Sequence, residues 1–426
     1  MSYSYYDRLD ETLFTRRLAN GLTVKVVPKK GFSRKLAYFV TDFGAIHRRF
    51  TLDGQEYHIP AGIAHFLEHK MFELPQRDVT GEFAALGANV NAFTSHDMTA
   101  YYFSCTENFR ENLQLLLEFV STPYFPEESV QREMGIIDQE IAMYEDDPGS
   151  REFEALMETM YCRHDVRTPV LGTRESIRKI TSETLHLCHR AFYTPANMVL
   201  CVVGDVSGEE VAAIAEATLG TQYRCPGVKI PQPEEPAACP QEPVRITMDV
   251  AMPTFQIGFK CAPAGRGQES LRTDVTGYLA AEVLMGESTD LYLELYEKEI
   301  IDSSFGGGFE TIDGCAMLTC GGDGEGGEKV RKALLEKAGR IIRDGIPREE
   351  FLRLKRGAMG RRIRDLDSFD ALCYRICAYH ILGYDYFGFP EVYASVTEQD
   401  VCDFLARFIT PERCAMATVT PSHKEK

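Results

Sequence analysis

Two histidines and a glutamate lie within one helical turn of each other in residues 62–73, which read GIAHFLEHKMFE. No residue breaks a helix before Pro75, so the sequence predicts a helix of about three turns here. Positions i, i+3 and i+4 share one helix face, so His65, Glu68 and His69 project together. Two such imidazoles can bind one tetrahedral zinc ion, and the carboxylate between them can reach a water activated by that ion.

The H-x-x-E-H order is the inverted form of H-E-x-x-H, but by itself it also fits a surface helix with two solvated histidines and an incidental glutamate. A catalytic zinc ion takes three protein ligands, so a third ligand must come from elsewhere. Glu133 and Glu140 lie seven residues apart in the predicted helix 127–144 and therefore share a face. One of them can bind zinc while the other holds a ligating histidine in place. The alternative is an acidic, solvated helix face.

A third patch, residues 87–95, reads GANVNAFTS. Its alternation of small, polar and β-favouring residues suits an edge strand, whose unpaired backbone groups can bind an extended peptide. Taken alone, the patch reads more simply as an ordinary hairpin.

Together, HFLEH and the downstream E-x6-E helix resemble the insulinase/pitrilysin family of zinc metallopeptidases. The segments GIAHFLEHKMFE and GIIDQEIAMYEDDP look especially like its bacterial YmfH-like branch. The resemblance covers essentially the whole chain. It implies one Zn²⁺ bound by His65, His69 and Glu140, with Glu68 as the general base and Glu133 supporting a ligand.

The same resemblance implies that the strand holds the peptide substrate beside the zinc ion through Asn91, Ala92 and Phe93. The chain is therefore expected to be a zinc endopeptidase. The alternative is a non-catalytic subunit of the same fold that binds peptides or scaffolds a complex.

One part of the family pattern is missing. Family members that work alone carry an arginine and a tyrosine, seven residues apart, that bind the substrate carbonyl. The matching segment here is 295–303, where Tyr296 takes the arginine position and Ser303 the tyrosine position. The resemblance thus implies a partner: a zinc-free paralogous subunit that supplies the arginine–tyrosine pair, or a second copy in a homodimer.

The elements around these residues follow one plan twice. A predicted helix at 182–190 precedes a strand at 198–203, and a helix at 398–407 precedes a strand at 414–419, each pair joined by a Thr-Pro turn. Matching order over this length suggests an internal duplication. Mixed strands and helices predict an α+β fold of two tandem halves. The resemblance implies that each half is built from related α+β roll units and that the halves enclose part of a chamber.

A proline-rich stretch at 225–243 separates the halves and reads as a linker. The sequence therefore predicts a zinc-binding catalytic half at 1–224 and a homologous half without a metal site at 244–426.

Composition limits the remaining possibilities. A formal net charge of −18 argues against a nucleic-acid-binding face. The 13 cysteines have no repeated C-x-x-C, which favours reduced thiols over a disulfide framework. No signal peptide and no apolar run of bilayer length is visible. A cytoplasmic protein is expected.

Overall fold

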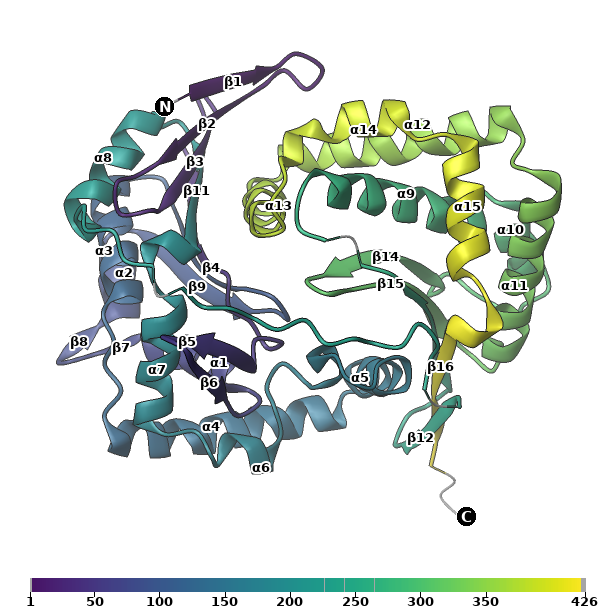
Figure 1. Ribbon diagram of the computed structural model, residues 1–426, viewed down its shortest axis with the longest axis horizontal. Helices are drawn as coiled ribbons and strands as arrows, with labels where there is room; N and C mark the ends of the chain where they lie inside the picture. Colours follow the sequence, from purple (N-terminus) through teal and green to yellow (C-terminus); the bar gives the residue numbers. More distant parts are fainter. Residues whose placement is uncertain (1, 226, 241, 264, 423–426) are drawn as a thin grey trace.

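The computed structural model describes residues 2–225, 227–240, 242–263 and 265–422, which fold around two β-sheets with helices packed on them (Figure 1). The predicted α+β class is therefore confirmed. Two short hairpins stand apart from the sheets: β5 (Arg49–Leu52) with β6 (Gln55–His58), and β7 (Glu73–Leu74) with β8 (Arg77–Asp78). None of the helices formed by these residues combines the length and the apolar character needed to cross a bilayer.

The first sheet has seven strands in the order β1-β2-β3-β11-β4-β10-β9. Their bounds are Ser2–Tyr6, Glu11–Arg17, Thr23–Pro28, Met198–Gly204, Lys35–Thr41, Thr99–Cys105 and Ala88–Thr94. The central strand β11 reads MVLCVVG and is buried along its whole length. Its β-branched residues suit a strand covered on both faces. It runs parallel to β3 and antiparallel to β4. Strand β9 is the last in the order and therefore forms one edge of the sheet.

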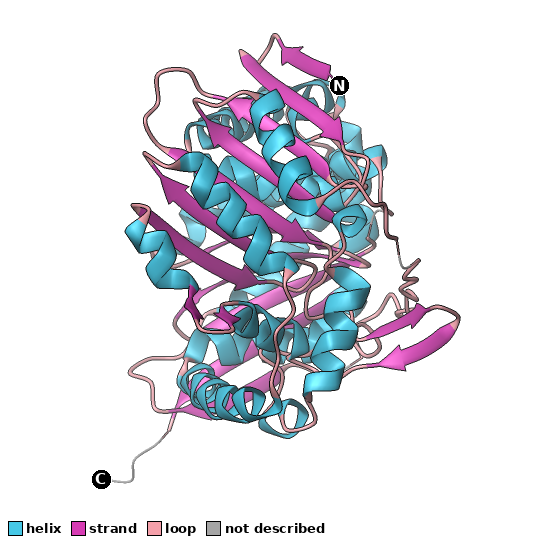
Figure 2. Ribbon diagram, turned by 90° about the vertical axis from the view of Figure 1, so that its left-hand side faces the viewer, coloured by secondary structure: helices cyan, strands magenta, loops and turns pink. Residues whose placement is uncertain are grey.

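Helices from the first half cover one face of this sheet (Figure 2). They are α1 (Ile63–Met71), α2 (Val79–Ala85), α3 (Phe109–Ser121), α4 (Glu127–Asp146), α7 (Ser182–Phe192) and α8 (Gly208–Leu219). Side chains alternate along each strand, so Val26 and Leu200 pack under these helices, whereas Val27 and Val203 face the other way. That second face packs against residues of the second half.

The second sheet repeats the plan with five strands in the order β12-β16-β13-β15-β14. Their bounds are Val244–Met248, Cys414–Pro421, Thr254–Cys261, Cys315–Asp323 and Gly306–Ile312. The order and directions match β3-β11-β4-β10-β9, including one parallel pair, here β12 with β16. The tandem halves predicted from the sequence are thus confirmed. The helices of this half are α9 (Gln268–Met285), α10 (Asp290–Glu297), α11 (Gly327–Asp344), α12 (Arg348–Arg364), α13 (Phe369–Ile381), α14 (Phe389–Ser395) and α15 (Glu398–Phe408).

One helix from each half packs on the sheet of the other half (Figure 1). Helix α5 (Pro148–Met160), from the first half, packs on β13 and β16, and α13, from the second half, packs on β11 and β4. The approach of α5 is close: a Cβ added to Gly258 of β13 would lie 2.4 Å from the sulfur of Met160. The two halves therefore share their buried surfaces.

Glu152 on α5 makes this shared surface sensitive to pH. It is 4% exposed, and its Oε1 accepts hydrogen bonds from Thr254 Oγ1 at 2.9 Å and from the Val419 backbone N–H at 3.3 Å. Burial raises the pKa of Glu152 to about 7, although these two bonds oppose the shift. Because the folded pKa lies above the unfolded value, the stability this group contributes is complete in acid and is lost as pH rises through about 7.

We therefore expect Glu152→Gln to stabilise the protein at pH 8. The amide oxygen can accept the same two hydrogen bonds without a buried charge. The gain in unfolding free energy should be at least about 1 kcal/mol, since one pKa unit corresponds to about 1.4 kcal/mol. Urea unfolding at pH 8 and at pH 4 measures it. The difference between variant and wild type should vanish at pH 4, and a variant less stable than wild type at pH 8 would contradict this account.

Between the end of α8 at Leu219 and the start of β12 at Val244, the described residues form no helix, and their one β-bridge pairs Lys229 with Thr51. Glu235 ties this stretch down by accepting a hydrogen bond from the buried ammonium group of Lys260 at 2.7 Å. The described residues of the predicted linker thus have irregular backbone, while the predicted domain limits stay a prediction.

Candidate metal centre

Helix α1 is fixed beneath the first sheet at both its start and its apolar face. It begins after Gly62, whose φ of 84° favours glycine, and a Cβ there would lie 2.2 Å from the carbonyl oxygen of Leu171. Ile63, Phe66 and Leu67 are buried in the core. The remaining face carries the two histidines and Glu68 and lies against α4.

Three donor atoms from α1 and α4 converge. Nε2 of His65 and Nε2 of His69 each lie 3.6 Å from Oε2 of Glu140, and all three ligand atoms lie within 4.8 Å of one another. Atoms bound to one tetrahedral zinc ion at about 2.0–2.2 Å lie about 3.3–3.6 Å apart, so the donor types and the two 3.6 Å separations fit a zinc ion. The 3.6 Å separations are too long for direct hydrogen bonds.

The pKa values of the two histidines shift in opposite directions. Burial, followed by the charge of His69, lowers the pKa of His65 to about 3, so its ring is neutral at pH 7 and has a lone pair to donate. Burial also acts to lower the pKa of His69, but the hydrogen bond to Glu133 and the nearby carboxylates outweigh it and raise that pKa. Protons compete with a metal ion for the His69 ring, so the affinity for the metal should fall as pH decreases.

Glu133, the other α4 glutamate named in the sequence analysis, lies next to His69 on the side away from Glu140. Its Oε1 is 3.0 Å from Nδ1 of His69. A proton on Nδ1 donated to this carboxylate leaves the lone pair of Nε2 facing Glu140, which fixes the tautomer that a metal needs.

Replacing Glu133 by Ala should therefore weaken zinc binding by about 10- to 100-fold without unfolding the protein. Competition with a chromogenic chelator measures the zinc affinity. Glu128→Ala on the same helix is the matched control, because the Glu128 side chain is 88% exposed. An unchanged zinc affinity in Glu133→Ala would show that His69 needs no such support.

Glu68 is 8% exposed and lies between the two histidines in the sequence. Burial raises the pKa of its carboxyl group, although a hydrogen bond from Thr94 Oγ1 to its Oε2, at 2.7 Å, acts in the opposite direction. Thr94 is a functional contact that the sequence analysis did not single out. It follows Phe93 directly in the NAFT segment, and that position was the available signal.

Strand β9, which carries Asn91, Ala92 and Phe93, pairs only with β10 and has its other edge unpaired within the described sheet. Its last residue is Thr94, the partner of Glu68, so this open edge begins beside the candidate metal centre. The ring of Phe93 lies 5.9 Å from that of Tyr374 on α13, which brings the second half next to the strand.

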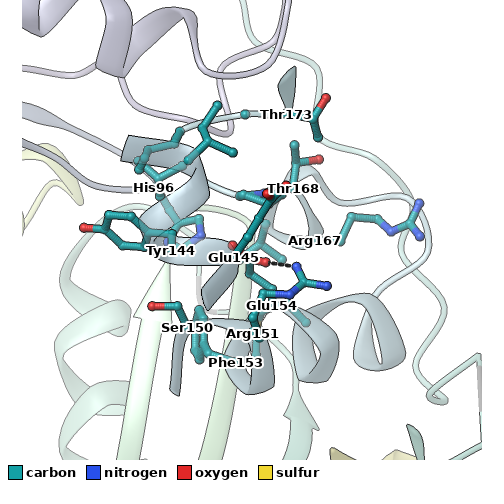
Figure 3. A pocket seen from close by; sticks show the side chains of 17 residues that line it. His96, Tyr144, Glu145, Ser150, Arg151, Phe153, Glu154, Arg167, Thr168 and Thr173 are labelled. Carbon is teal, nitrogen blue, oxygen red and sulfur yellow. Dashed lines mark hydrogen bonds and ion pairs between the residues drawn. The ribbon is translucent and has the colours of Figure 1, made fainter. Parts of the chain in front are cut away.

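A cavity of about 190 Å³ adjoins the carboxyl end of α4 (Figure 3). It is lined by Ile141 and Tyr144, which follow Glu140 by one and by four residues, together with Phe153 of α5 and His96 of the turn between β9 and β10. Arg151 and Glu154 pair with each other at its wall (Figure 3). Most of its lining is apolar, so it suits an apolar side chain.

The segment that departs from the family pattern lies elsewhere. Tyr296 is on α10, 50% exposed and stacked on Tyr292, and Ser303 follows in an exposed turn. Neither residue is among the groups that contact the candidate metal centre.

Comparison with known proteins identifies the family of the chain. A family model described as Insulinase (Peptidase family M16) matches residues 55–174, and one described as Peptidase M16 inactive domain matches residues 179–358. The uncharacterized zinc protease YmfH of Bacillus subtilis (strain 168) is 36% identical over 424 residues, 98% of each chain.

Solved structures show the same fold. An M16-like peptidase from Alicyclobacillus acidocaldarius superposes with a TM-score of 0.93 and 32% identity, covering 97% of this chain and 99% of that one. A protease from Helicobacter pylori, with a TM-score of 0.81 and 20% identity over 96% and 99% of the two chains, shares the fold. Given the relative that matches along its whole length, the chain belongs to the insulinase family, peptidase family M16, in its YmfH-like branch.

Proposed function

We propose that this protein is a zinc-dependent endopeptidase, with zinc held by His65, His69 and Glu140 and with Glu68 as the general base. The observation that carries the proposal is the convergence of the three donor atoms within 4.8 Å of one another, beside a buried carboxylate. The name zinc protease, given to YmfH, supports it. The residues concerned lie in the segment matched by the insulinase model.

A zinc ion bound here would supply a Lewis acid that polarises the scissile carbonyl and makes a nearby water more acidic. Glu68 would take the proton from that water and return it to the leaving amine. Its burial raises the carboxyl pKa and so makes it a better proton acceptor than an exposed glutamate. The Thr94 hydroxyl holds one carboxylate oxygen and leaves the other free for this exchange.

The unpaired edge of β9 would bind the peptide as an added strand through the backbone of Asn91, Ala92 and Phe93. The cavity beside Glu140 would accept an apolar side chain of that peptide. The strand reaches the site through Thr94, which donates a hydrogen bond to Glu68, and the cavity is lined by Ile141 and Tyr144 of the helix that carries Glu140. This proposal also assigns residues 1–224 to the catalytic half, residues 225–243 to a linker and residues 244–426 to a half without a metal site.

We further propose that the chain is the zinc-bearing subunit of a two-subunit peptidase. Tyr296 and Ser303 occupy the positions at which family members that work alone resemble one another in carrying an arginine and a tyrosine. A zinc-free paralogue would supply that pair; a second copy of this chain would not, because it has the same substitutions. All 13 cysteines are free thiols, which supports a cytoplasmic location.

The competing function is a non-catalytic subunit that binds peptides or scaffolds a complex. The description of the second family model as an inactive domain, together with the missing arginine–tyrosine pair, favours it. The complete donor set in the first half favours the enzyme.

Zinc analysis combined with cleavage of quenched peptides tests the proposal, using the chain alone and with proteins that co-purify with it. We expect one zinc per chain, turnover that requires the partner, and loss of turnover on chelation while the circular dichroism spectrum stays unchanged. Full turnover by the lone chain would rule out the partner. A zinc-loaded complex that cleaves no peptide would favour the scaffold, and unfolding on chelation would indicate a structural metal.

A further inference from the structure

Next to His69, helix α1 carries a buried cation that the proposed chemistry does not use. Lys70 is 1% exposed, and its ammonium group donates hydrogen bonds to the hydroxyl of Ser129 and to the carboxylate of Glu73. The Ser129 hydroxyl in turn donates to the same carboxylate. The three side chains therefore form a closed triangle in which each contacts the other two.

The triangle joins the two helices that carry the donor atoms. Lys70 lies in the last turn of α1, and Ser129, which is 3% exposed, lies in the first turn of α4. Ser129 is one turn before Glu133 on that helix, and Glu140 follows two turns later. Fixing Ser129 against Lys70 thus sets where the carboxylates of α4 stand relative to the histidines of α1.

Packing alone does not explain a lysine here. Taking an ammonium group out of water is costly, and an apolar side chain of similar length would fill the space more cheaply. A buried lysine with two directed acceptors supplies what an apolar residue lacks, namely a preferred register between two helices. None of the three side chains supplies a donor atom to the metal centre, so the triangle can form before any metal binds.

We propose that Lys70, acting through Ser129 and Glu73, is a positioning residue that holds α1 and α4 in the register the zinc site requires. The inference rests on the proposed function, since it assumes that the three donor atoms bind zinc. Lys70 acts on the donors through the helix backbone and does not touch the reacting atoms.

Ser129→Ala is the cleanest test, because it cuts the link to α4 and leaves the Lys70–Glu73 pair in place. Lys70→Met removes the charge while keeping most of the side-chain volume. Both should raise the zinc dissociation constant at least about tenfold, as loss of a supporting contact does at other metal sites. Both should also change the visible absorption spectrum of the cobalt-substituted protein, which reports ligand geometry and is insensitive to a uniform loss of stability.

Arg132→Met is the matched control. Arg132 lies 3.8 Å from Glu73 but is 64% exposed, so the pair is screened by water and should not position the helices. Its zinc affinity and cobalt spectrum should equal those of wild type. Circular dichroism of the metal-free variants establishes that each one folds.

The double variant Lys70→Met/Glu73→Gln separates positioning from a simple charge effect. If Lys70→Met weakens zinc binding only by removing the positive charge that balances Glu73, neutralising Glu73 should restore the affinity. Positioning predicts that the affinity stays low. Restored affinity, or a folded Ser129→Ala protein with wild-type zinc affinity and cobalt spectrum, would overturn the inference. Wild-type protein that binds no zinc would overturn the proposed function as well, so the two failures are distinguishable.

Discussion

Glu68→Gln should retain zinc and lose nearly all peptidase turnover. The amide has almost the shape of the carboxylate, and its oxygen can still accept the hydrogen bond from Thr94. The donor atoms of His65, His69 and Glu140 should therefore stay where they are. What the variant lacks is a group able to take a proton, and removing a general base costs about 10²- to 10⁴-fold in rate.

The comparison requires the form of the protein that cleaves peptides, with the proposed partner subunit where turnover depends on it, and zinc content measured on the same sample. Glu128→Gln, at a position where the side chain is 88% exposed, provides a control that changes the charge equally. Substantial hydrolysis by a zinc-loaded Glu68→Gln protein would remove Glu68 from the mechanism. Loss of zinc from the variant would instead assign Glu68 a role in binding the metal.

His65→Ala and Glu140→Ala should each lose both metal and activity. Each removes one of three donor atoms that come from two different helices, so the two donors left form an incomplete site. We expect zinc affinity to fall by at least about 10²-fold, more than for loss of the supporting Glu133. Zinc content after dialysis and turnover at saturating zinc provide the measurements.

The folded state should survive these two substitutions. Ile63, Phe66 and Leu67 hold α1 in the core on the face away from the site. The circular dichroism spectra of both variants should thus match that of the metal-free wild type. Normal zinc content in Glu140→Ala would mean that the third ligand lies elsewhere.

The sequence alone predicted the parts of the site that depend on local geometry. The spacing of His65, Glu68 and His69 needs only a helix, and the structure has one at Ile63–Met71. The spacing of Glu133 and Glu140 likewise needs only the helix Glu127–Asp146. Helical periodicity determines which side chains share a face, so both sets could be identified without knowing how the helices pack.

Contacts between distant segments could not be predicted in this way. Thr94 meets Glu68 because β9 ends beside α1, and Lys70 meets Ser129 because the last turn of α1 lies against the first turn of α4. Neither of these two contacts produces a periodic pattern in the sequence. From the residues alone, a glutamate on α4 could equally have faced solvent, and the family resemblance was needed to choose Glu140 over Glu133.

The same limit applies to the fold. Matching helix and strand segments revealed the duplication, since element order can be read along one chain. The exchange of α5 and α13 between the sheets could not be predicted. An amphipathic sequence shows that a helix buries one face, but it does not show which of the two sheets covers that face.

This exchange ties the two halves together mechanically. A protease that cuts the chain between residues 227 and 240 would produce two fragments, each of which keeps a helix that covers the sheet of the other. The nicked molecule should remain one particle on gel filtration, whereas either fragment made separately would expose a bare sheet face and precipitate. Because of this exchange, the halves cannot separate without uncovering both sheets, so the proposed peptide substrate would have to reach β9 while they stay together.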